Sequence, residues 1–132
     1  WGNEDYDSSL SPYKRQGLKE SLLFNPTAKS TYMFQSSQSH LRLIDAQETQ
    51  RFYDVINRYT LAINQATRLN LEAGYRWQEG SRIDMEDLTG RMSVDFNFGN
   101  FMMTTEYDFE KQLYLQDSLI NHFFFTRINR RF

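Results

Sequence analysis

The sequence predicts an all-β protein of antiparallel up-and-down strands, of the class that closes into a transmembrane β-barrel. Three observations predict this class: long runs of alternating apolar and polar residues, turn sequences between those runs, and many aromatic residues despite low hydropathy. The 132 residues include 11 Phe, 8 Tyr and 2 Trp, yet the mean hydropathy is −0.70. A strand that faces lipid reconciles these values, because only its alternate residues are apolar.

The clearest alternation lies in residues 91–110, where Gly99-Asn100 separates two alternating runs. Both residues tolerate positive φ, so this dipeptide predicts a two-residue hairpin turn. The resulting register keeps one face almost wholly apolar, whereas a slip of one residue would mix the faces. The expected cross-strand pairs are Phe98 with Phe101, Phe96 with Met103, Val94 with Thr105, Met92 with Tyr107, and Arg91 with Asp108.

Two further hairpins are expected, one turning at Asn64-Gln65-Ala66-Thr67 and one at Asn25-Pro26-Thr27. Residues 1–16 are expected to form an external loop or an upstream connection, and residues 17–132 the barrel strands. At least one strand would then precede Trp1; alternatively, a poorly patterned strand in 1–16 closes an eight-stranded barrel. The expected strands are residues 17–25, 28–38, 50–65, 68–78, 91–98, 101–113 and 120–132.

The connections are expected to differ in length at the two ends of the strands. Polar segments at 36–50, 79–90 and 111–118 would form long loops, opposite the short turns. Such asymmetry is typical of outer-membrane barrels, whose short turns face the periplasm. Four of the alternating segments run for about ten residues or more, which is what a tilted strand needs to cross a bilayer.

The last alternating segment ends in Phe132, with Ile128 and Phe124 on the same parity. Here the sequence resembles bacterial outer-membrane β-barrel proteins, whose final strand ends in an aromatic residue that the barrel-assembly machinery reads. The resemblance implies a bacterial outer-membrane location and an assembly signal formed by Phe124, Ile128 and Phe132. Arg130 departs from the pattern, which usually has an apolar residue there, and Phe123 and Phe125 add apolar bulk to the other face.

The alternation also assigns side chains to lipid or to the barrel lumen. Mixed charges in a lumen pair with one another in a narrow barrel or line a channel in a wide one. The residues expected to face lipid are Leu69, Leu71, Tyr75, Trp77, Val94, Phe96, Phe101, Met103 and Tyr107. Those expected to face the lumen are Arg58, Arg68, Glu72, Arg76, Arg91, Asp95, Glu106, Asp108 and Arg127. Two aromatic belts are expected, one of Phe24, Phe98, Phe101 and Phe132, the other of Tyr53, Tyr75, Trp77, Tyr107 and Phe109.

Two competing structures remain open. Alternation also describes soluble sheets with one buried face, so a soluble β-rich binding module with an apolar interior is the alternative to a membrane barrel. Residues 45–63 also fit helical spacing, because Asp45-Ala46-Gln47-Glu48 resembles a capping box.

No enzymatic activity, cofactor or metal site is expected. His40 and His122 are the only histidines, neither lies in a metal-binding spacing, and no GxSxG motif occurs. An outer-membrane hydrolase would need a histidine beside Ser or Asp. The chain has no cysteine, so a thiolate site is excluded. Asp84, Glu86 and Asp87 have the chemistry of a Ca²⁺ site, although a solvated loop is the preferred interpretation.

The expected function is a transmembrane pore or scaffold, for transport or for anchoring an envelope complex. The expected partners are outer-membrane lipid, the barrel-assembly machinery, and further strands or other envelope proteins. Nucleic acid is not an expected partner, because the net charge is only −2.

Overall fold

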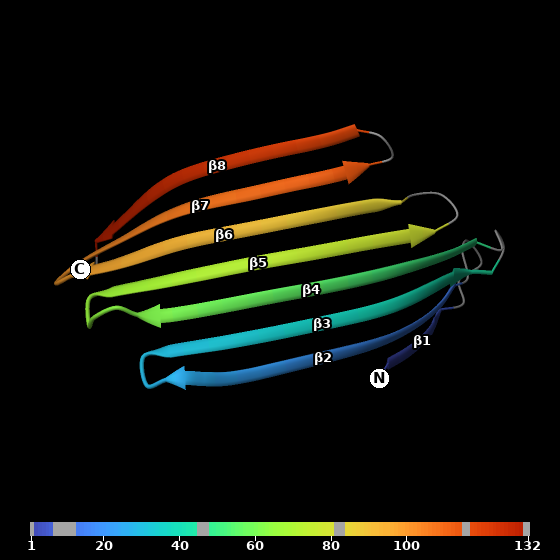
Figure 1. Ribbon diagram of the computed structural model, residues 1–132, viewed down its shortest axis with the longest axis horizontal. Coiled ribbons are helices and arrows are strands. Elements are labelled where there is room, and N and C mark those ends of the chain that lie inside the picture. The colour runs from blue at the N-terminus through green and yellow to red at the C-terminus, as the bar shows by residue number, and fades with distance from the viewer. Residues whose placement is uncertain (1, 7–12, 45–47, 81–83, 115–116, 131–132) are drawn as a thin grey trace.

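The chain folds into one antiparallel sheet in which each strand pairs with its neighbours in sequence (Figure 1). The computed structural model describes all residues except 1, 7–12, 45–47, 81–83, 115–116 and 131–132, and it does not describe the side chains of 3–6. The all-β, up-and-down prediction is confirmed. The strands are β1 (Gly2–Tyr6), β2 (Tyr13–Thr27), β3 (Ser30–Leu43), β4 (Glu48–Ala62), β5 (Thr67–Gly80), β6 (Met85–Phe98), β7 (Phe101–Tyr114) and β8 (Asp117–Arg130).

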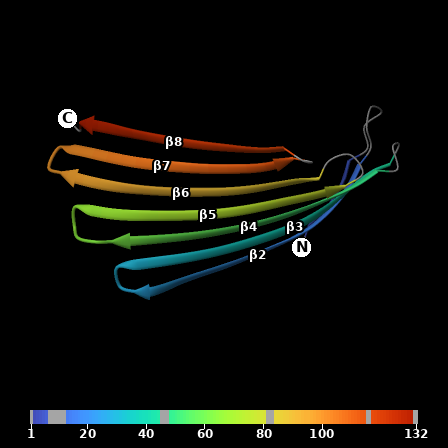
Figure 2. The same cartoon turned by 45° about the horizontal axis from the view of Figure 1, so that its top comes forward.

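The sheet formed by the described residues is open rather than closed into a barrel (Figures 1 and 2). β1 and β8 are its two outermost strands. β1 pairs only with residues 13–17 of β2, so the outer edge of β2 beyond Gly17 has no partner strand in the described part of the chain. The barrel expected from the sequence is therefore not completed by these strands alone.

The sheet has no hydrophobic core. Among the described residues, no hydrophobic side chain is buried; the buried residues are Ser30 (4 % exposed) and Ser93 (8 %). Large apolar side chains are exposed on the sheet, with Phe124 at 71 % and Ile128 at 67 % exposure. A single layer of strands leaves both faces uncovered, so its apolar side chains must be covered by something other than this sheet.

The hairpin of β6 and β7 has the register that its sequence predicts. Phe98 pairs with Phe101, and the remaining expected pairs follow from it. Gly99 has a φ of +56°, a left-handed conformation that glycine adopts without steric cost. The turn between β4 and β5 is also confirmed at residues 63–66, where the Ala66 backbone N–H donates to Asn64 Oδ1 at 2.8 Å.

The first hairpin turns later than expected. Residues 25–27 belong to β2, and the turn lies at residues 28–29. The register of β2 against β3 shifts between Phe24 and Thr27, at Pro26. Proline has no backbone N–H to donate, so it is tolerated at a bulge without ending the strand. The Thr27 and Ser30 hydroxyls lie 2.7 Å apart and hold the turn together.

Several expected boundaries are wrong because the strands are longer than the alternating pattern suggests. The boundary expected at residue 17 falls inside β2, and β1 occupies residues 2–6 within the expected loop segment 1–16. The connections 44–47, 81–84 and 115–116 are about as short as the turns 28–29, 63–66 and 99–100. The predicted asymmetry between long loops and short turns is therefore absent between β2 and β8.

The helical alternative for residues 45–63 is wrong where the structure describes them. Residues 48–62 form β4, while 45–47 lie outside the described part. β4 pairs with β3 and β5 along most of its length, and these ladders satisfy its backbone. No helix in the described part of the chain is long and apolar enough to cross a membrane.

Candidate functional site

The candidate functional surface is the pair of faces that the sheet presents. Cross-strand partners point to the same side, so the register assigns each strand residue to one face. We call the side that carries Leu71 and Met92 the apolar face, and the side that carries Glu72 and Arg91 the polar face.

The register places each expected group of residues on a single face. The apolar face carries the nine residues expected to contact lipid: Leu69, Leu71, Tyr75, Trp77, Val94, Phe96, Phe101, Met103 and Tyr107. The polar face carries the nine expected to line a lumen: Arg58, Arg68, Glu72, Arg76, Arg91, Asp95, Glu106, Asp108 and Arg127. This segregation is a property of the sheet, whereas contact with lipid or with a lumen stays a prediction.

Aromatic rings gather on the apolar face toward both strand ends. Tyr53 stacks on Trp77, with ring centroids 5.0 Å apart, near the end opposite the short turns. At the short-turn end, the Arg130 guanidinium lies 5.7 Å from the centroid of the Phe101 ring. All the described residues of the two expected aromatic belts lie on this face, and Phe132 lies outside the described residues.

Two pairs of polar side chains on the apolar face bond to each other. The Tyr32 hydroxyl donates to Asn57 Oδ1 at 2.5 Å, between β3 and β4. The hydroxyls of Thr105 and Thr126 lie 3.3 Å apart, between β7 and β8. These contacts remove polar groups from the surface that the face offers to its surroundings, and such groups are costly to leave unsatisfied in an apolar medium.

The two histidines also lie on the apolar face. His122 Nδ1 is 2.8 Å from the Tyr107 hydroxyl, and its ring lies against Phe109 with centroids 5.4 Å apart. His40 is the register partner of Arg51. In the part of the chain that the structure describes, neither histidine bonds to a serine or a carboxylate, which is the arrangement a hydrolase would need.

The acidic residues considered for Ca²⁺ do not converge. Glu86 and Asp87 are consecutive in β6, so they point to opposite faces, and Asp84 precedes the strand. Within the described ranges, no three His, Asp or Glu side chains form a group able to hold a metal ion. The idea of a cation site in this segment is therefore wrong for the described residues.

On the polar face, side chains connect neighbouring strands in three rows. The row nearest the short turns is uncharged except for Asp95. Asn70 Nδ2 donates to Ser93 Oγ at 3.2 Å and to Asp95 Oδ2 at 3.0 Å. Thr104 Oγ1 donates to the other carboxylate oxygen of Asp95 at 2.8 Å, and Thr60 Oγ1 donates to Asn70 Oδ1 at 3.2 Å. This row joins β4 to β7.

The middle row consists of ion pairs. Arg58 of β4 pairs with Glu72 of β5. Arg91 of β6 lies with its Nε 2.7 Å from Asp108 Oδ1 and 3.1 Å from Glu106 Oε1, both on β7. One guanidinium thus contacts two carboxylates and reduces the repulsion between them, although the three side chains together keep a negative charge.

The third row lies nearest the end opposite the short turns. Arg76 Nε donates to Asp54 Oδ1 at 2.6 Å, and the Ser37 hydroxyl donates to Asp54 Oδ2 at 3.3 Å. Farther along the sheet, Glu110 accepts from Gln112 Nε2 at 2.8 Å and from Asn121 Nδ2 at 3.4 Å. The polar face is therefore a layer of hydrogen bonds and ion pairs that runs from β3 to β8.

The residues expected from the sequence to line a lumen leave out two that organise these rows. Asp54 and Asn70 share the parity of the charged residues on their strands, which is the signal that identifies them. Conversely, Arg68 and Arg127 are on the polar face as expected, but neither forms an ion pair within the described residues. Ion pairs thus neutralise only part of the charge on this face, at Arg58, Arg76 and Arg91.

Comparisons with protein-family models, with curated proteins and with solved structures found no match.

Proposed function

We propose that this chain forms part of the wall of a bacterial outer-membrane β-barrel that acts as a transmembrane pore or scaffold, for transport or for anchoring an envelope complex. The proposed role is not enzymatic and involves no cofactor. The proposed partners are outer-membrane lipid, the barrel-assembly machinery, and the further strands or envelope proteins that complete the barrel; nucleic acid is not among them.

Strand length supports a bilayer crossing. Each strand from β2 to β8 has 14 or 15 residues. At about 3.3 Å per residue, a 14-residue strand extends about 46 Å, and a tilt of about 45° projects this to roughly 33 Å. That projection slightly exceeds the hydrocarbon thickness of about 30 Å. Strands in soluble proteins are usually about 5–6 residues long.

The apolar face supports contact with lipid. It exposes large side chains without covering them, among them Met92 at 47 % and Leu22 at 56 %. Patches of this kind on a soluble monomer promote association, whereas a bilayer covers them. The hydrogen-bonded pairs Tyr32–Asn57 and Thr105–Thr126 further suit a medium without water.

The open edges support a barrel larger than this sheet. β2 beyond Gly17 and β8 each have one outer edge that no described strand pairs. Unpaired backbone groups are costly in hydrocarbon, so the proposed barrel needs additional pairing at both edges. Because β2 and β8 run in the same direction, the missing strand beside each must run the other way in an up-and-down barrel.

The exposed apolar residues of β8 support the proposed outer-membrane location. Phe124 and Ile128 lie on the apolar face and are strongly exposed. Phe132, the third residue of the proposed assembly signal, lies outside the described residues. An exposed, aromatic edge strand is suited to recognition by strand addition during assembly.

One observation carries the proposal: consecutive residues of the central strands alternate between an open apolar face and a polar face whose side chains form hydrogen bonds and ion pairs. The chain has no cysteine, so single cysteines can report on each face. We expect a small fluorophore at Leu71→Cys to be quenched by brominated lipid in reconstituted vesicles, and the same fluorophore at Arg68→Cys, an exposed position on the polar face, to remain unquenched.

The same experiment separates the proposal from a soluble binding module. Equal quenching at both positions, or a folded monomer that stays in plain buffer without binding vesicles, would contradict the membrane proposal. The second result would favour the soluble β-rich module.

A further inference from the structure

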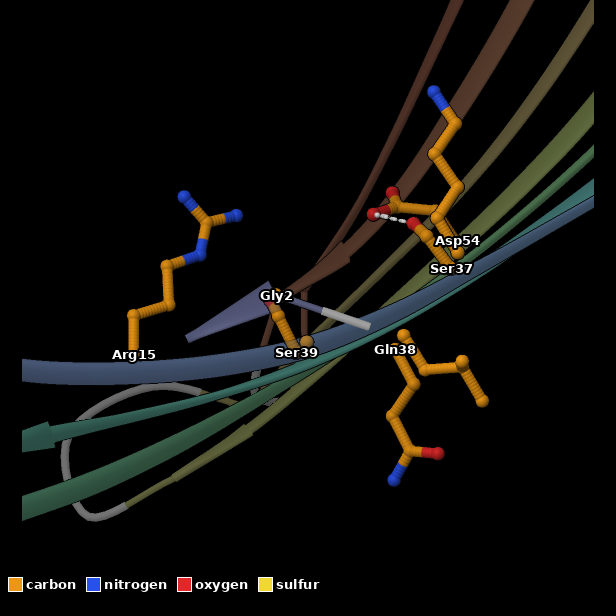
Figure 3. A pocket seen from close by; sticks show the side chains of 9 residues that line it. Gly2, Arg15, Ser37, Gln38, Ser39 and Asp54 are labelled. Carbon is orange, nitrogen blue, oxygen red and sulfur yellow. Dashed lines mark hydrogen bonds between the residues drawn. The ribbon is translucent and has the colours of Figure 1, made fainter. Parts of the chain in front are cut away.

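A recess opens on the polar face where two glycines face each other. Gly2 of β1 is the register partner of Gly17 of β2, so side chains are missing on both strands at this point. The hollow measures about 330 Å³, and its lining includes Arg15, Lys19 and Ser39 (Figure 3). We propose that this recess binds a phosphate-type oxyanion.

Strand geometry brings two cations to the recess. Arg15, Gly17 and Lys19 alternate along β2, so all three lie on the same face, with the glycine between the cations. Their Cα atoms span about 13 Å at roughly 3.3 Å per residue, so both long side chains can reach over Gly17. Arg15 has Glu4 as its register partner on β1, whereas Lys19 lies beyond the end of that pairing. Neither cation has an ion pair among the described side chains.

The carboxylate in the lining is already neutralised. Asp54 Oδ1 accepts from Arg76 Nε at 2.6 Å, and its Oδ2 accepts from the Ser37 hydroxyl at 3.3 Å. Figure 3 shows this Ser37–Asp54 contact on the same side of β2 as Arg15, while Gln38 points to the opposite side. Among the described side chains, the recess therefore keeps the positive charges of Arg15 and Lys19 in excess.

The donors match an oxyanion rather than a cation or an apolar ligand. A guanidinium presents a fork of N–H groups to two oxygens, and an ammonium adds a compact point charge. Ser39, opposite Gly17, supplies a hydroxyl close to the same position. A Cβ built on Gly17 would lie 3.3 Å from the Gln38 carbonyl oxygen and 3.4 Å from Ser39 Cβ, so a side chain at Gly17 would narrow the recess.

The oxyanion is expected to be a soluble one. The recess lies on the polar face, opposite the apolar face that we propose to contact lipid. A lipid headgroup would instead approach from the apolar side, where Lys14 and Arg42 are cross-strand partners. Oxyanion binding in the recess goes beyond the proposed membrane function and does not depend on it, whereas the assignment to a soluble anion rests on that function.

Inorganic phosphate titrated into the refolded full chain, followed by calorimetry at constant ionic strength, tests the proposal. We expect saturable binding that weakens at least tenfold in Arg15→Gln/Lys19→Gln, since both charged donors are lost. Lys14→Gln is the matched control, because it removes one positive charge from the same strand on the opposite face. Its phosphate affinity should remain within about twofold of the parent chain.

A second variant tests the recess without removing charge. Gly17→Val fills the hollow while both cations remain, and we expect it to weaken phosphate binding as well. Circular dichroism establishes that each variant keeps its strands. Absence of binding to the parent chain, unchanged binding in Gly17→Val, or equal loss in Lys14→Gln would overturn the proposal.

The source of the phosphate group is tested by competition. Phosphatidylglycerol mixed into the detergent micelles should not displace inorganic phosphate from the recess. Displacement would make this a lipid site and overturn the assignment to a soluble anion. Failure of any of these measurements leaves the vesicle experiment on Leu71 and Arg68 unaffected, so the two proposals fail separately.

Discussion

The central strands, β4 to β7, separate apolar and polar residues onto opposite faces more completely than the long strands near the two edges, β2 and β8. In β4 to β7, apolar residues largely keep to one face, and polar residues on the other bond across the strands. In β8, Phe123 (55 % exposed) lies on the polar face next to Phe124, which is 71 % exposed on the apolar face. In β2, Leu23 likewise exposes an apolar side chain on the polar face.

This difference shows which strands find partners for their side chains and backbone within the sheet and which do not. Many polar side chains of the central strands bond to neighbours that the sheet itself supplies, although Asp87 Oδ1 is buried without a hydrogen-bond partner. Both β2 and β8 carry apolar groups on both faces, and the described strands leave the outer backbone edge unpaired along β8 and along β2 beyond Gly17. Covering these groups therefore requires additional strands or an assembly factor. Perturbations of the centre should therefore act mainly on stability, and perturbations of the edge mainly on assembly.

The largest effect is expected at the C-terminal edge. Deleting Phe132 or changing it to Ser should remove most of the protein from the outer membrane in cells, because a recognition signal is lost. The effect on stability after refolding should be only about 1.5–3 kcal/mol, the contribution of one buried aromatic side chain. Outer-membrane levels compared with refolding yield in detergent measure the two effects.

The matched control for the edge is Phe98→Ser, which removes a strand-end aromatic residue beside the turn of a central hairpin. It should lower stability by a similar amount and leave insertion in cells largely intact. Equal loss of insertion in both variants would contradict the claim that the edge strand, and not the central hairpin, determines assembly.

The next effect concerns the apolar face of the centre. Leu71→Arg and Val94→Arg should each lower the free energy of unfolding by about 2–4 kcal/mol in vesicles, because a charge near the bilayer midplane is poorly solvated. Asn97→Arg on the exposed polar face should cost far less. Urea titrations in vesicles measure the three values, and similar costs would argue against contact with lipid.

An arginine at Ser93 is not a suitable control for contact with lipid, although Ser93 also lies on the polar face. Ser93 is only 8 % exposed and accepts a hydrogen bond from Asn70 in the row nearest the short turns. An arginine at Ser93 would have to displace that row, so its cost would reflect crowding rather than the surrounding medium.

Sequence predicted the centre far better than the edges, for a physical reason. Between β6 and β7, Gly99 fixes the turn and each residue's polarity matches its face, so only one register is consistent. In β3, residues 35–39 are Gln-Ser-Ser-Gln-Ser, and uniform polarity hides a strand that backbone pairing continues to Leu43. Side-chain periodicity cannot detect a strand whose two faces are chemically alike.

For the polar face, the sequence predicts which side of the sheet each residue occupies but not its individual contacts. Parity alone placed the charged residues of the polar face, because alternation does not require knowledge of individual contacts. The pairing of one cation with two carboxylates at Arg91 depends on side-chain geometry and was not predictable in detail. The recess at Gly17 was missed because residues 1–16 were assigned to a loop, which hid the partner strand β1.

A smaller effect is expected at the central turn. Gly99→Ala should lower stability by about 1 kcal/mol, because a Cβ is unfavourable at a φ of +56°. Gly99→Asn should recover part of this loss, since Asn tolerates the left-handed region. The control is Gly90→Ala, whose added Cβ would lie 3.8 Å from Phe109 Cβ, an ordinary contact. Thermal melts that rank Gly90→Ala as the more damaging would contradict this account of the turn.

The smallest effect is expected in the middle row of the polar face. Arg91→Gln should lower stability by at most about 1 kcal/mol at low salt, because the Arg91 side chain is 55 % exposed and its ion pairs are screened by solvent. The loss should shrink in 1 M NaCl, where the screening length falls to about 3 Å and repulsion between Glu106 and Asp108 weakens. Arg68→Gln is the matched control, as Arg68 is an exposed arginine on the same face without an ion pair among the described residues. A salt-dependent cost at Arg91 and none at Arg68, measured by urea unfolding at both salt concentrations, would show that the centre neutralises its own charge. Equal, salt-independent costs would mean that the row contributes packing alone.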